Sequence, residues 1–256
     1  MRAVRKLYAT LLLILVAAAL LSLWVTPLWG SRVRPHNLVF VLFVVGLLLT
    51  VTSARRTLSH ISTFAHELSH CAGAALVGAT PRKIIYNPDS SGLAVLEFPE
   101  RVGRYRRSVV LMAGYLGPLL AAGALLSGLT IGESRETLFV VSVVSGVSLL
   151  LLVRNLWGVL ITSILGFLAW SAASHLPDAA SQGVIALLIG ILCGLGVADT
   201  IGQYRLPDPA GCDAEAASFE LHRLPWKLIA ATQVLMSVAL AVLNAYFLFS
   251  LYRLNA

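Results

Sequence analysis

Long apolar runs separated by short polar segments dominate the chain. A membrane-spanning helix needs about 20 mostly apolar residues, and most of the runs approach or exceed that length. The runs are Leu7–Trp24, Leu38–Thr52, Ser108–Leu129, Leu138–Val153, Leu156–Ala173, Gly183–Val197 and Trp226–Leu251. A further segment, residues 57–77, mixes apolar and polar positions at helical spacing. The pattern predicts an all-α polytopic membrane protein with about six to eight transmembrane helices.

The helical pattern breaks between Arg82 and Phe98. Two short β-prone stretches, Lys83–Tyr86 and Leu93–Phe98, flank a turn-rich segment, Asn87–Gly92. This arrangement predicts a β-hairpin. An isolated hairpin is only marginally stable in water, so we expect it to lean on the helices or to pair with a partner.

Composition agrees with a membrane protein. Hydrophobic residues make up 58% of the chain and charged residues 12%, whereas soluble domains carry roughly 25% charged residues. We interpret residues 1–256 as a single integral membrane domain, with N-terminal helices in 1–56, a central motif region in 57–130 and C-terminal helices in 131–256. The formal net charge of +7 fits loops that contact the lipid bilayer rather than nucleic acid. The membrane orientation and the oligomeric state stay open.

The candidate chemistry lies in the segment His66-Glu67-Leu68-Ser69-His70, which reads H-E-x-x-H. On a helix, residues four apart share a face, so His66 and His70 can bind one zinc ion. Glu67 is then placed to take a proton from water at that ion. Ionisable residues in an apolar helix are costly and therefore indicate a functional site. His60 shares the face of Glu67, either as a partner of the site or as an interfacial histidine near the helix end.

Two histidines do not complete a zinc site, because catalytic zinc usually has three protein ligands. Asp199 ends one span, and Asp213 opens a predicted helix before the last span. Cys212 is another possible ligand, since thiolate binds zinc. The remaining histidines considered, all expected in loops, are His36, His175 and His222.

Here the chain resembles the site-2 protease family of intramembrane zinc metallopeptidases, and within it the bacterial branch of peptidase-like membrane proteins. The resemblance is carried by the H-E-x-x-H segment in its apolar helix, by the hairpin-like Arg82–Phe98, and by Ala113-Gly114-Tyr115-Leu116-Gly117-Pro118. The branch often shows a Ser-Asp-Ala-like triplet before its final helix, which Cys212-Asp213-Ala214 matches. The chain lacks the Leu-Asp-Gly sequence of better-known members, and its Asn-Pro, Asn87-Pro88, falls in the hairpin.

The resemblance implies an enzyme with defined parts. His66, His70 and Asp213 would bind Zn²⁺, with Asp199 as the alternative third ligand, and Glu67 would be the catalytic base. The substrate would be a membrane protein or peptide, hydrolysed within a bacterial plasma membrane. Independently of the resemblance, the predicted Arg82–Phe98 hairpin offers a free strand edge, which we expect to hold an unwound substrate by strand addition.

Two other functions compete with proteolysis. The first is a zinc-binding membrane protein that no longer cleaves and acts as a regulator or partner. The second is a small transporter in which His66, Glu67 and His70 relay protons or ions. Transporters of that kind usually carry an internal repeat with paired broken helices, and the two halves of this sequence do not match one another.

Overall fold

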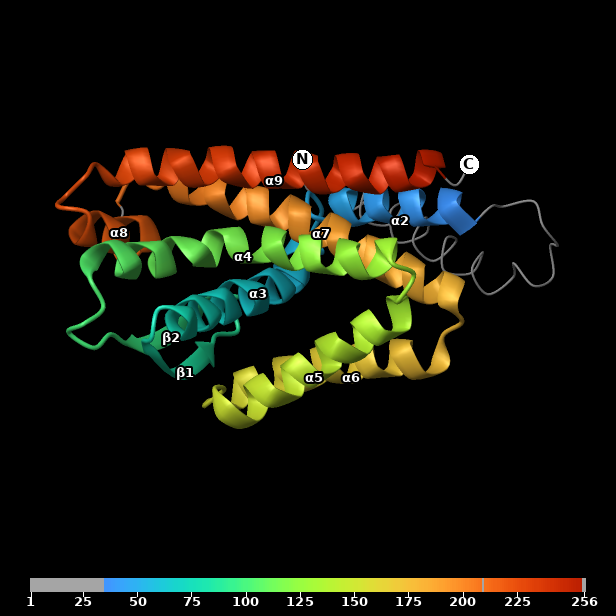
Figure 1. Ribbon diagram of the computed structural model, residues 1–256, viewed down its shortest axis with the longest axis horizontal. Helices are drawn as coiled ribbons and strands as arrows, with labels where there is room; N and C mark the ends of the chain where they lie inside the picture. The colour runs from blue at the N-terminus through green and yellow to red at the C-terminus, as the bar shows by residue number, and fades with distance from the viewer. Residues whose placement is uncertain (1–34, 209, 255–256) are drawn as a thin grey trace.

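The computed structural model describes residues 35–208 and 210–254 and consists mainly of helices (Figure 1). The predicted run Leu7–Trp24 lies outside these described residues. The helices are α2 (Pro35–Leu49), α3 (Arg55–Leu76), α4 (Arg104–Thr130), α5 (Ser134–Leu151), α6 (Leu156–His175), α7 (Asp178–Tyr204), α8 (Asp213–Glu220) and α9 (Trp226–Leu254). Strands β1 (Thr80–Tyr86) and β2 (Gly92–Glu97) follow the H-E-x-x-H helix α3.

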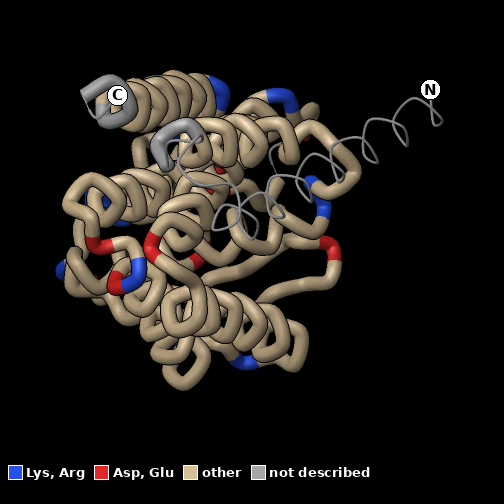
Figure 2. Tube along the Cα trace, turned by 90° about the vertical axis from the view of Figure 1, so that its right-hand side faces the viewer, with Lys and Arg blue, Asp and Glu red and all other residues tan. Residues whose placement is uncertain are grey.

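Five of the described helices, α4, α5, α6, α7 and α9, are long and apolar enough to cross a membrane. Helix α2 is apolar but shorter, and α3 carries many polar side chains. Figure 2 shows how few charged positions interrupt these helices. The predicted polytopic helical architecture with one hairpin is therefore confirmed, and each predicted run within residues 35–254 coincides with a helix.

Close helix packing builds the main core. Helices α2, α4, α7 and α9 lie side by side, while α5 and α6 form a pair next to the hairpin (Figure 1). At the crossing of α2 and α7, Gly46 and Gly190 face one another, and a Cβ on either would overlap backbone atoms of the other helix. Small residues allow such close approach of membrane helices. The G-x-x-x-G spacing of Gly190 and Gly194 thus serves packing within this chain, since Gly194 meets Thr50.

The hairpin packs against the helices. This is one of the two arrangements expected from the sequence, the other being pairing with a partner. Strands β1 and β2 pair antiparallel, from Thr80 opposite Glu97 to Tyr86 opposite Gly92. The outer edge of β1 bonds to the connection between α5 and α6, where the Ile84 N–H donates to Leu152 O at 2.8 Å. The described residues add no strand to the outer edge of β2, so this edge is open to a further strand.

We expect Asn155→Ala to loosen the hairpin. The Asn155 side chain accepts from the Tyr86 N–H at 3.1 Å and donates to the Tyr86 carbonyl at 2.6 Å. Its loss leaves two backbone groups beside a fully buried tyrosine without partners, which costs roughly 1–3 kcal/mol for each such group. Amide hydrogen exchange in residues 80–97 should therefore speed up.

Asn87→Ala is the matched control, because the Asn87 side chain donates to Ser91 Oγ in the exposed turn and does not contact Tyr86 or the helices by a hydrogen bond among the described residues. Equal exchange rates in the two variants would mean that Asn155 does not anchor the hairpin.

Candidate metal centre

Helix α3 directs the side chains of His66, Glu67 and His70 toward the interior of the protein. His70 and Glu67 are buried, and His66 is half-buried beside them. The facing helix α4 approaches closely at Gly114 and Gly117. A Cβ at Gly114 would come within 2.6 Å of His66 Nε2 and closer still to His70 Nε2. The backbone of α4 therefore forms one wall of the histidine pair.

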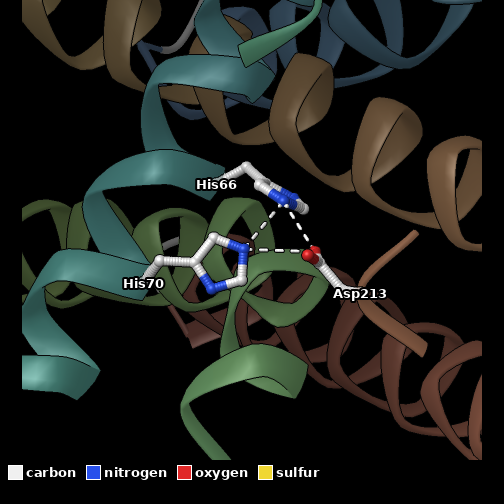
Figure 3. A group of neighbouring side chains, drawn as sticks. All are labelled: His66, His70 and Asp213. Atoms are coloured by element: carbon white, nitrogen blue, oxygen red, sulfur yellow. Dashed lines mark hydrogen bonds and ion pairs between the residues drawn. The ribbon is translucent and has the colours of Figure 1, made fainter. Parts of the chain in front are cut away.

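Asp213 meets the two histidines from the far end of the chain (Figure 3). The Asp213 carboxylate oxygen Oδ2 lies 3.1 Å from the Nε2 atoms of both His66 and His70, and these two nitrogens are 3.1 Å apart. His70 and Asp213 are separated by 143 residues in sequence. Among the described residues, His66, His70 and Asp213 are the three side chains of the types His, Cys, Asp or Glu whose ligand atoms come close enough together to hold a metal ion.

Local sequence explains how α8 presents Asp213. Gly211 adopts a φ of +80°, and the Gly211 N–H donates to Glu215 in the first turn at 2.9 Å. This contact resembles a capping box, and acidic residues in a first turn also suit the helix dipole. Ala214 and Ala217 then pack against Ile229 at the start of α9. Burial opposes ionisation of Asp213, but hydrogen bonds donated by the His66 and His70 rings, when these are protonated, outweigh it and hold the pKa of the carboxyl group well below its usual range.

The hydrogen bonding of His70 supports a cation between these groups. His70 Nδ1 lies 2.9 Å from the Val110 carbonyl oxygen, and because a carbonyl only accepts, Nδ1 must carry the proton. In the neutral ring, Nε2 then holds a lone pair aimed at the carboxylate oxygen of Asp213 and at His66 Nε2. Such lone pairs repel one another unless the rings are protonated or a cation lies between them. Backbone bonds of this kind fix the orientation of metal-binding histidines.

The ligand set also fits zinc by size and chemistry. Zinc takes histidine nitrogen and carboxylate oxygen at about 2.0–2.2 Å, and neighbouring ligands of such a tetrahedron stand about 3.3 Å apart. The 3.1 Å separations of His66, His70 and Asp213 are close to this value.

Glu67 lies between α3 and strand β2. The residue is 4% exposed. A Cβ on Gly92 would come within 2.5 Å of Glu67 Oε1, so only glycine leaves room for the carboxylate at this strand position. The backbone N–H of Ala94, two residues further along β2, interacts with the same carboxylate. Contacts with Gly92 and Ala94 of β2 thus fix the position of the Glu67 carboxylate.

Two clefts reach this centre. The larger, of about 710 Å³, lies between the N-terminal half of α3, the hairpin turn and the end of α7. The smaller, of about 450 Å³, lies between β2, α4 and α8. His66, Glu67, Gly92 and Tyr115 line both clefts. Solvent or a ligand can therefore reach Glu67 from two sides.

Other candidate ligands lie elsewhere. Asp199 accepts from Ser62 at 3.0 Å and from Arg55 at 3.3 Å, and is not part of the converging group. Cys212 lines the smaller cleft next to Asp213 but is also outside that group. His60 is buried, with Nε2 3.3 Å from Ser90 Oγ in the hairpin turn, and among the described residues no hydrogen bond joins it to Glu67.

The prediction that His36, His175 and His222 lie in loops is wrong for the first two. His175 ends helix α6 and stacks edge-on with Trp170, and His36 falls within the range of α2 rather than in a loop. The side chain of His36 lies outside the described residues. His222 does lie after α8, with a φ of 58°. At His36 and His175 the helix extends a few residues beyond the predicted apolar run.

Sequence reasoning missed two parts of the site. The Tyr115 ring meets the His66 ring edge-on, with centroids 4.7 Å apart. The Val110 carbonyl orients His70. Tyr115 lies within the segment Ala113–Pro118 that carries part of the family resemblance. Nothing in the local sequence predicts that Tyr115 or Val110 contacts the histidines.

The apolar helices and the converging histidine and carboxylate groups are typical of a membrane-embedded metallopeptidase. The sequence profile of the family described as Peptidase M50B-like matches residues 13–249, so the chain belongs to this family. The resemblance to the site-2 protease family is confirmed. By family and by its helices, the protein is a metallopeptidase and a multi-pass integral membrane protein. Neither the curated proteins nor the solved structures gave a match.

Proposed function

We propose that the protein is an intramembrane zinc metallopeptidase that hydrolyses peptide bonds of membrane-embedded substrates. His66, His70 and Asp213 are the proposed ligands, and Glu67 is the proposed base. The observation that carries the proposal is the convergence of these three ligand atoms beside a buried glutamate in a multi-pass membrane protein.

Each residue has a separate task. Zinc held by His66, His70 and Asp213 would act as a Lewis acid, polarising the substrate carbonyl and lowering the pKa of water toward neutrality. Glu67 accepts the proton of the attacking water on its carboxylate and passes it to the departing amine. Gly92 and Ala94 keep that carboxylate in place from the side of β2. The bond from His70 Nδ1 to Val110 keeps the His70 lone pair directed at the centre.

Water and substrate need different routes to such a site. The larger cleft is lined by hydroxyl and charged groups, including Ser59, Ser62 and Asp199, and suits water. A membrane-embedded helix must unwind before its peptide bonds can react, and the freed backbone groups must then find new partners. The outer edge of β2 has no strand partner among the described residues, so its backbone groups other than the Ala94 N–H, which contacts Glu67, would supply such partners by strand addition.

Metal analysis of two aspartate variants tests the proposed ligands. Purified wild-type protein should hold about one zinc ion for each chain. Asp213→Ala should lose most of this metal, because it removes a carboxylate that lies 3.1 Å from both histidine nitrogens.

Asp199→Ala is the matched control, since Asp199 bonds Arg55 and Ser62 instead. We expect it to retain zinc. The reverse result, with metal lost from Asp199→Ala and kept by Asp213→Ala, would transfer the third ligand to Asp199.

A further inference from the structure

Tyr115 on α4 lies at the centre, and its hydroxyl group is free to bind a ligand. The Tyr115 ring packs edge-on against the His66 ring, and the preceding residue, Gly114, faces the histidine nitrogens. The hydroxyl forms no hydrogen bond with any described residue. The Tyr86 hydroxyl also has no partner but is fully buried, whereas that of Tyr115 keeps access to the clefts. Because a tyrosine hydroxyl in a buried site usually finds a partner, a molecule in the clefts is the partner left for Tyr115.

The position of Tyr115 indicates which part of such a molecule it meets. Four of the described residues line both clefts, namely His66, Glu67, Gly92 and Tyr115. His66 is a proposed ligand, Glu67 is the proposed base, and glycine has no side chain. Tyr115 is therefore the residue at this junction that can donate a hydrogen bond without holding the metal or taking the proton. The charges of Asp213 and Glu67 both act on the Tyr115 hydroxyl, so this donor lies near the reacting groups.

We propose that the Tyr115 hydroxyl is a catalytic hydrogen-bond donor that stabilises the oxyanion formed during peptide hydrolysis. This inference rests on the proposed function. When water adds to the substrate carbonyl, one electron pair of the C=O bond moves onto the oxygen, and Glu67 receives a proton of the water. Tyr115 donates its O–H to that oxygen and keeps its own proton. The electron pair returns to re-form the C=O bond as the amine leaves with the proton from Glu67.

A phenol is suited to this task at membrane depth. It carries no charge, so it avoids the high cost that a free ammonium or guanidinium group has in a membrane-embedded site. Its hydrogen bond to a neutral carbonyl is modest and becomes stronger when the oxygen gains negative charge. An interaction that grows in the transition state raises kcat and leaves KM nearly unchanged.

Tyr115→Phe tests the hydroxyl while keeping the ring against His66. We expect kcat to fall about 10–10²-fold, because a hydrogen bond to a charged oxygen is lost, with KM and zinc content unchanged. Tyr105→Phe is the matched control, since Tyr105 lies on the same helix, is 74% exposed and lines neither cleft. Wild-type kcat in Tyr115→Phe, or a loss confined to KM, would overturn the proposal. A fall in zinc content would do the same, because it would make Tyr115 a support for His66.

Inhibitor binding gives a readout that does not depend on hydrolysis. A peptide phosphonamidate carries a charged oxygen at the position of the oxyanion, and the matched peptide amide carries a neutral carbonyl there. Both are measured with zinc-loaded Glu67→Gln protein, so that the amide is not cleaved. Adding Tyr115→Phe should weaken phosphonamidate binding about 10–10²-fold and leave amide binding unchanged. Equal losses for the two compounds, no loss for either, or no phosphonamidate binding before the change would each overturn the proposal.

The two measurements separate the role of Tyr115 from the proposed function. A selective loss of phosphonamidate binding, together with no cleavage of any peptide by the wild-type protein, would support the Tyr115 contact and count against hydrolysis alone. Equal cleavage by the wild-type and Tyr115→Phe proteins would leave the proposed hydrolysis standing and remove Tyr115 from it.

Discussion

Glu67→Gln should reduce peptide hydrolysis about 10²–10⁴-fold while leaving zinc bound, since this is the usual contribution of a general base. The amide keeps the size of the carboxylate and its contacts with Gly92 and Ala94, but cannot accept the proton of the attacking water. His66, His70 and Asp213 are untouched, so zinc content measured on the same preparation should equal that of the wild-type protein.

Glu97→Gln is the control for removing a negative charge from the same part of the molecule. Glu97 ends β2 and forms an exposed ion pair with Arg82, outside both clefts. An exposed pair contributes little stability, so this variant should remain active. If Glu67→Gln cleaves as well as the wild-type protein, Glu67 is not the base. If the wild-type protein binds zinc and cleaves nothing, the catalytically silent alternative replaces the proposed enzyme.

Gly114→Ala should lose both zinc and hydrolysis, although it adds only one methyl group. The new Cβ would occupy the space of the two Nε2 atoms that are proposed to bind the metal. Either the imidazoles turn away or α4 shifts from α3, and a ligand displaced by 1 Å no longer reaches a zinc at about 2.0–2.1 Å. We expect zinc content to fall below one tenth of the wild-type value and cleavage to fall in parallel.

Gly123→Ala on the same helix separates this effect from a general loss of helix packing. The nearest atom to a Cβ at Gly123 is Asn244 Oδ1 at 3.4 Å, an ordinary contact. This variant should retain zinc and activity. Full zinc occupancy in Gly114→Ala would mean that the histidines are not held as Figure 3 shows them.

The sequence determined the parts of this protein that depend on local spacing. Apolar runs of the required length predicted the membrane helices, because backbone groups in lipid must bond within their own segment. Two β-prone stretches around a turn predicted the hairpin. The spacing of His66 and His70 predicted one shared helix face, since 3.6 residues per turn fixes that geometry whatever surrounds the helix.

Only the tertiary structure decided which distant residues complete the site. The residues alone left Asp199 and Asp213 open as third ligands. Asp213 does begin α8, but Asp199 lies inside α7 and not at the end of a span as predicted, because the helix continues to Tyr204. Packing of α8 against α4 and α9 brings Asp213 to the histidines, while α7 directs Asp199 to Arg55 and Ser62. The same packing made Gly114 a wall of the centre and brought two clefts together at Glu67. Such contacts depend on how helices cross, which the periodicity of a single segment does not encode.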